Sequence, residues 1–142
     1  RNTYLTKPKG KVLLSARTLT GLVHGLAAGL AAGNQMLVEA FGDLGSVVRD
    51  LPEDIRQRVE MVREIGSGAA RAVLVEGNGE AVTAMSKAVA EWDGPIVTVQ
   101  GVSSEALEHG EAVFAIDLLV DEVSTSVTTA AAGGTANLLA LA

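Results

Sequence analysis

The stretch VEGNGEAV, residues 75–82, is the part of the sequence that most resembles a binding motif. A glycine turn between a strand and a helix is where parallel α/β sheets hold phosphate groups on the N–H donors of the helix. The glycines do not follow the spacing G-x-G-x-x-G, however, and Glu76 and Glu80 would repel a pyrophosphate. We therefore interpret the stretch as a tight strand-to-helix turn, with a phosphate site as the alternative.

Side chains suited to metal binding or nucleophilic catalysis are scattered along the sequence. The chain has no cysteine, which excludes disulfides, thiolate metal ligands and a cysteine nucleophile. His24 and His109 are far apart and lack a second ligand at a zinc-type spacing. The hydroxyl groups of residues 128–135 have no neighbouring base, and GKV at 10–12 lacks the order of a P-loop. We predict no catalytic residue, no metal site and no bound cofactor in this chain.

The charges are unevenly distributed along the chain, whose net charge is −6. Five basic residues precede the first acidic one, Glu39: Arg1, Lys7, Lys9, Lys11 and Arg17. An acidic domain repels the nucleic-acid backbone, so we expect no nucleic-acid partner and interpret the basic start as a solvated or docking segment. The absence of cysteine fits a reducing compartment and a cytoplasmic location. A first residue other than methionine suggests a piece of a longer polypeptide.

Apolar runs alternate with helical patterns over the first hundred residues. We predict strands at 11–16, 35–40, 71–77 and 95–101, and helices at 19–32, from Asp50 to Ile65, and at 78–94, with 41–50 irregular. Strands that alternate with helices through short loops form a parallel sheet whose two faces are covered by helices. The sequence therefore predicts an open, mainly parallel, Rossmann-like α/β fold.

Glycines recur at every fourth residue of the helix predicted at 19–32, at Gly21, Gly25 and Gly29. This spacing places them on one face of the helix, where each costs about 1 kcal/mol relative to alanine. We expect this bare face to let the helix backbone approach the sheet or a neighbouring helix closely.

The last third of the chain has a different character. We predict a short helix from Ser103 or Ser104 to His109 and an extended strand at 118–129. A glycine-rich break and the apolar segment 135–142 follow, which suggests a hairpin or arm that docks on another surface or on a second copy. We divide the chain into a domain at 1–127 and a docking tail at 128–142. The predicted docking residues are Thr128, Thr129, Gly133, Gly134, Leu138, Leu139 and Leu141.

Three stretches, taken in order, resemble the aldehyde dehydrogenase superfamily. LAAGLAAGNQMLVEA (26–40) is similar to the helix ending AALAAGN that leads into the strand ending LVKPAE. VLVEGNGEAV (73–82) resembles the turn FTGSTEVG, with Gly77 and Glu80 in register, and residues 108–134 resemble the terminal oligomerisation arm. Glu39 replaces the lysine that contacts the adenosine ribose of NAD, and the catalytic domain with its cysteine is missing. The resemblance implies a degenerate cofactor domain.

A truncated domain of this kind resembles the C-terminal domain of the longer bifunctional proteins of the proline utilization A (PutA) family. The similarity includes RNTY (1–4), GPIVTVQG (94–101) and SVTTAAAGGTANLL (126–139). It implies a parent that oxidises proline with FAD and glutamate semialdehyde with NAD, through an internal channel. The parent would be cytoplasmic or peripheral at the inner face of the bacterial membrane.

The resemblance assigns this domain a non-catalytic role. It would dock on the dehydrogenase module of the same polypeptide, seal the channel and support the active site. There are two alternatives: the domain is a regulatory module that binds a nucleotide at 76–80, or it self-associates through the tail.

Overall fold

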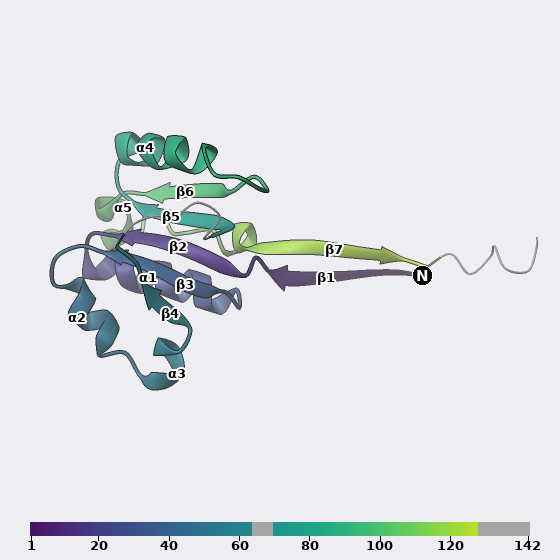
Figure 1. Ribbon diagram of the computed structural model, residues 1–142, viewed down its shortest axis with the longest axis horizontal. Helices are drawn as coiled ribbons and strands as arrows, with labels where there is room; N and C mark the ends of the chain where they lie inside the picture. The colour runs from purple at the N-terminus through teal and green to yellow at the C-terminus, as the bar shows by residue number, and fades with distance from the viewer. Residues whose placement is uncertain (64–69, 128–142) are drawn as a thin grey trace, which may run out of the picture.

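The computed structural model describes residues 1–63 and 70–127, and its body is built on one parallel sheet (Figure 1). The strand order is β4-β3-β2-β5-β6. The strands are β2 (Lys11–Ala16), β3 (Gln35–Ala40), β4 (Val59–Met61), β5 (Ala72–Glu76) and β6 (Thr98–Val102). All neighbouring pairs in this sheet are parallel, so the predicted Rossmann-like fold is confirmed.

Helices cover both faces of the sheet. Their bounds are α1 (Leu19–Ala31), α2 (Leu44–Arg49), α3 (Glu53–Arg56), α4 (Gly79–Ala90), α5 (Ser104–Glu108) and the 3₁₀ helix η1 (Ile116–Leu119). Successive side chains of a strand point to opposite faces. Leu14 of β2 accordingly packs in the core cluster that contains α1, α5 and η1, whereas Leu13 packs with Val89 of α4. Within the described ranges, no helix has both the length and the apolar character needed to cross a membrane.

The path of the chain reverses direction once within the sheet. It runs outward from β2 through β3 to β4, returns to β5 on the other side of β2, and ends at β6. The reversal lies between β2 and β5, and in open α/β sheets ligands bind beside the carboxyl ends of the strands at such a point. The turns after β2 and β5 are therefore the first place to look for a site.

A two-stranded ribbon projects from this body (Figure 1). It pairs β1 (Asn2–Pro8) with β7 (Val120–Ser126) in antiparallel register, from Asn2 opposite Ser126 to Pro8 opposite Val120. Every residue of β1 is exposed, and the N-terminus lies at the far end of the ribbon. The extended strand predicted at 118–129 is confirmed over β7. Its partner in the structure is β1, and the predicted second arm at 135–142 lies outside the described residues.

The long helix predicted from Asp50 to Ile65 is wrong. Helix α3 ends at Arg56, and the chain then forms β4 along the outer side of β3. The N–H of Met36 donates to the carbonyl of Arg58, and the N–H of Val62 donates to that of Val38. Pairing with the free edge of β3 therefore holds this segment in an extended conformation. Ile65 lies outside the described residues.

Other boundaries also differ from the prediction, and the helix predicted at 78–94 ends at Ala90. Residues 41–50, predicted to be irregular, contain α2, which buries Leu44 and Val48 four residues apart on one face. Strand β6 begins at Thr98 rather than at Pro95, opposite Ala72, the first residue of its partner β5.

The glycine face of α1 packs directly against the sheet, as predicted. A Cβ atom at Gly21 would overlap the carboxylate of Glu76, and one at Gly25 would overlap the side chain of Leu14. A Cβ at Gly29 would overlap the sulfur of Met36. The three glycines therefore face β5, β2 and β3 in turn, and their small size sets how closely the helix approaches.

Candidate functional site

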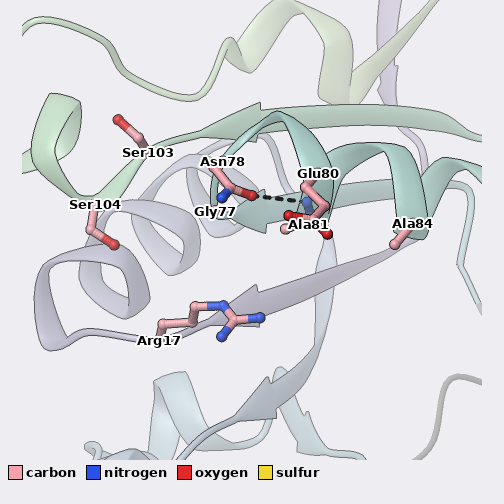
Figure 2. Close-up of a pocket in the computed structure, with 8 residues that line it drawn as sticks. All are labelled: Arg17, Gly77, Asn78, Glu80, Ala81, Ala84, Ser103 and Ser104. Atoms are coloured by element: carbon pink, nitrogen blue, oxygen red, sulfur yellow. Dashed lines mark hydrogen bonds between the residues drawn. The ribbon is translucent and has the colours of Figure 1, made fainter.

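An open cavity of about 530 Å³ lies beside the turns that follow β2 and β5, at the reversal of the sheet (Figure 2). It is lined by Arg17, Gly77, Asn78, Glu80, Ala81, Ala84, Ser103 and Ser104. The Asn78 side chain caps α4, because its Oδ1 accepts a hydrogen bond of 3.0 Å from the N–H of Ala81. The cavity therefore occupies the position at which this fold class holds ligands.

The structure brings Glu39, Gly77 and Glu80, the positions that the resemblance relates to a cofactor site, to the same edge of the sheet. Gly77 and Glu80 line the cavity, and Glu39 lines an adjoining hollow of about 280 Å³. Arg17 borders both, and its guanidinium carbon lies 5.0 Å from the ring centre of Phe41. The charged side chains at this edge of the sheet are thus one arginine, Arg17, and two carboxylates, Glu39 and Glu80.

Gly77 has a structural reason to be glycine. A Cβ atom there would lie 2.7 Å from the Cβ of Ala81. Its N–H donates a 3.0 Å hydrogen bond to the carbonyl of Val102, which continues the pairing of β5 with β6. These contacts support the interpretation of residues 75–82 as a tight strand-to-helix turn.

Glu76 points inward instead of into the cavity. The residue is 0% exposed, and its carboxylate accepts hydrogen bonds from the N–H groups of Arg17 (2.6 Å) and Thr18 (2.9 Å). The hydroxyls of Thr18 and Ser104 also donate to it, the latter at 2.8 Å. The carboxylate therefore joins the end of β5 to the starts of α1 and α5. The residues that it contacts lie 28 to 59 positions away along the chain, so no local sequence pattern predicts this role.

The hydrogen bonds to Glu76 decide its charge state. Burial raises the pKa of the carboxyl, but the bonds from Thr18, from the Arg17 N–H and from Ser104 outweigh burial and hold the pKa below its ordinary value of 4.5. The folded protein therefore prefers Glu76 ionised.

We expect the chain to lose stability in acid through Glu76. A lowered folded-state pKa gives a stabilisation that is fully present above the unfolded pKa near 4.5 and is lost as the pH falls through the folded value. The melting temperature should be measured between pH 7 and pH 3 for the wild type and for Glu76→Gln. The gap between the two should be constant above about pH 5.5 and shrink below pH 4.5. A constant gap down to pH 3 would contradict the assignment.

A second set of contacts fixes the ribbon to the body. The buried side chain of Asn34 accepts a hydrogen bond from the Gly10 N–H and donates one to the Leu119 carbonyl, both 2.9 Å long. Asp121 of β7 forms salt bridges with Lys9 (2.8 Å) and Arg71 (2.9 Å). Hydrogen bonds from these two cations lower the pKa of Asp121. The base of the ribbon is therefore held in a defined orientation.

Gln100 also has a structural role. It lies on β6, and both polar atoms of its side-chain amide bond to the backbone of Ala115, at 2.8 and 3.0 Å. The predicted docking residues, from Thr128 to Leu141, lie outside the described residues. Within the described part of the chain, no cluster of three or more histidine or acidic side chains is arranged to hold a metal ion.

Known proteins with similar sequences share one name. The chain is 38% identical over 142 residues to the bifunctional protein PutA of Rhizobium meliloti, covering 99% of this chain and 12% of that protein. It is 34% identical over 143 residues to the bifunctional protein PutA of Escherichia coli K12, covering 99% and 10%. The chain thus spans about a tenth of the length of these relatives. No protein-family model matches the chain.

Solved structures with a similar fold carry the same name. One is proline utilization A (PutA) with proline bound in remote sites, with a TM-score of 0.59, 18% identity, and coverage of 72% of this chain and 12% of that one. Another is a mutant of Bradyrhizobium japonicum PutA, with a TM-score of 0.60, 18% identity and the same coverage. At this identity the structures support the fold, while the sequence relatives establish the kinship. Over nearly its whole length, the chain is therefore homologous to one domain-sized segment of the much longer proline utilization A proteins.

Proposed function

We propose that the chain is the non-catalytic C-terminal domain of a longer bifunctional protein. In this proposal it docks on the dehydrogenase module of the same polypeptide, where it seals the substrate channel and supports the dehydrogenase active site. The parent oxidises proline to glutamate by way of glutamate semialdehyde, and uses FAD for the first oxidation and NAD for the second. The two sequence relatives are called bifunctional proteins and are about ten times as long as this chain, which supports the existence of such a parent.

The observation that carries the proposal is the projecting ribbon. An isolated two-stranded ribbon is at best marginally stable in water, and its outer edges leave backbone donors and acceptors free to pair with another chain. Here β1 is exposed along its full length, while Asp121 and Asn34 fix the direction in which the ribbon points. A rigid base with an uncovered end is what a docking arm requires.

The outer part of the ribbon is suited to a protein surface. Residues 2–6 and 123–127 contain no charged side chain. Tyr4 is 76% and Leu5 is 56% exposed, and an open groove of about 460 Å³ lies beside Tyr4, Leu5, Thr6 and Glu122. Exposed aromatic and aliphatic side chains of this kind mark interaction surfaces. The tail from Thr128 to Leu141 would continue the same contact, and in an isolated chain it would favour self-association.

The expected location of the domain follows from that of the parent. We propose that the parent is cytoplasmic, with peripheral association at the inner face of the bacterial membrane. We also propose that this domain contacts the dehydrogenase module rather than nucleic acid.

The proposal predicts that a charge in the ribbon impairs the parent enzyme. Leu5→Glu in the full-length protein should reduce proline-dependent NADH formation by about tenfold or more, because burying an unpaired charge at an interface costs as much as losing a hot-spot side chain. Proline oxidation with an artificial electron acceptor should stay at the wild-type level. Steady-state kinetics of both reactions, with dehydrogenase turnover on added glutamate semialdehyde, would test this.

Val23→Glu provides a matched control. Val23 lies on the outer face of α1 and is 55% exposed, almost the same as Leu5, so the substitution adds the same charge outside the ribbon. Its kinetics should match those of the wild type. Unchanged kinetics for Leu5→Glu would refute docking through the ribbon.

The cavity of Figure 2 favours one other function, a regulatory site for a nucleotide. It lies at the reversal of the sheet and is bordered by Arg17 and the start of α4. Calorimetric titration of the chain with NAD and with AMP separates the two functions. Micromolar binding would favour the regulatory module, and no heat of binding would leave docking as the function of the domain.

A further inference from the structure

The carboxylate of Glu76 is held in the way that proteins hold a bound anion. Two successive backbone N–H groups, of Arg17 and Thr18, point at it from the turn between β2 and α1, and the hydroxyls of Thr18 and Ser104 complete the set. Successive backbone N–H donors in a turn form a concave site for anions. We refer to these four donors as the anion site.

No cation shares in the recognition. Among the residues that the structure describes, both salt bridges involve Asp121 rather than Glu76. A buried carboxylate must be compensated by donors or by a cation, and here donors alone provide the compensation. The anion site therefore has the chemistry of a receptor for a small carboxylate.

Helix α1 is also shaped around the carboxylate. A Cβ atom at Gly21 would overlap Oε2 of Glu76, so the helix has no side chain where the carboxylate lies. Arg17 and Ser104 also line the cavity of Figure 2, which places the anion site beside an opening to solvent. A small anion would have access to the site if Glu76 did not fill it.

We propose that Glu76 acts as a built-in anionic ligand, which occupies a carboxylate-binding site at the start of α1 and thereby excludes external anions from it. The site is complete without an external molecule, and its occupation holds together β5, α1 and α5. Removing the side chain would turn the internal contact into a binding site for a free small carboxylate. This inference is independent of where the domain docks.

Chemical rescue of Glu76→Ala by acetate tests the proposal. The substitution removes a carboxylate and one adjoining carbon, which together have the size of acetate. The variant of the 142-residue chain should melt roughly 5–10 °C below the wild type in sodium chloride. Sodium acetate at the same ionic strength and pH 7 should raise its melting temperature saturably, as ligand binding to the folded state does.

The wild type and two further variants test whether the effect of acetate is specific to the vacated site. The wild type should melt at the same temperature in both salts, and so should Glu80→Ala, which removes an exposed carboxylate from the neighbouring cavity. Glu76→Gln should be destabilised without responding to acetate, because the amide still fills the site.

The proposal is overturned if Glu76→Ala is as stable as the wild type, or if acetate stabilises it no more than chloride does. If the variant is unfolded in chloride, acetate must restore its helical circular dichroism, and a failure to do so has the same meaning. A response of Glu76→Gln equal to that of Glu76→Ala would also overturn it, since the effect would not then depend on a vacated site.

Discussion

Replacing Gly25 with leucine is expected to lower the melting temperature by roughly 10 °C or more. Gly25 faces β2, and even a Cβ atom there would overlap the side chain of Leu14, which is fully buried. A leucine adds three further carbons to a place with no free volume, which costs about 3 kcal/mol or more in the free energy of unfolding. The gain in helix propensity, about 1 kcal/mol, is too small to offset this. Thermal unfolding followed by circular dichroism is the measurement.

Gly79→Ala is the matched control for this experiment. Gly79 is the first residue of α4, and no atom lies within 4 Å of where its Cβ would be. The free energy of unfolding should change by less than about 0.5 kcal/mol. If Gly25→Leu melted at the wild-type temperature, the close approach of α1 to the sheet would not be what its glycine face provides.

The features that could be predicted from sequence are those with a local pattern. Strands β2, β3 and β5 are short apolar runs, and burial on both faces gives such runs. The glycine face of α1 follows from its four-residue spacing alone. In both cases the residues that carry the signal are close together in the sequence.

The features that could not be predicted depend on distant partners. Strand β4 has three residues and is extended because it pairs with β3, whereas its sequence also fits a helix. Strand β1 has no core face, and its partner is more than a hundred residues away. The pattern of apolar residues in a sequence reflects burial and local spacing. Neither β4 nor β1 has a pattern of this kind.

The candidate site shows the same division. The glycine turn at 77–79 and its position between a strand and a helix follow from the sequence. The direction of Glu76 does not, because a glutamate before a turn next to Glu80 resembles a pair of surface acids. Its burial depends on donors from Thr18 and Ser104, which only the folded sheet brings to it. The acid that the sequence suggested would repel a ligand instead holds three elements together.

Asn34→Ala is expected to cost about 2 kcal/mol in the free energy of unfolding, because it removes the two hydrogen bonds that this fully buried side chain makes with the Gly10 N–H and the Leu119 carbonyl. The side chain of Asn34 is the link between the loop at Gly10 and the carbonyl of Leu119, where β7 begins. The substitution should therefore destabilise the ribbon more than the rest of the domain. Amide hydrogen exchange of β1 and β7 should accelerate more than that of β2 and β5, since the ribbon would open before the sheet does.

Asn78→Ala is the control that separates a buried link from a helix cap. The side chain of Asn78 accepts one hydrogen bond, from the N–H of Ala81 at the exposed start of α4, and losing such a cap costs about 1 kcal/mol. The excess destabilisation of Asn34→Ala over Asn78→Ala measures the link to the ribbon. Equal losses, with uniform exchange across β1 and β2, would mean that the ribbon is not anchored through Asn34. The orientation of the proposed docking arm would then depend on the salt bridges of Asp121, which salt screens much more readily than a buried amide.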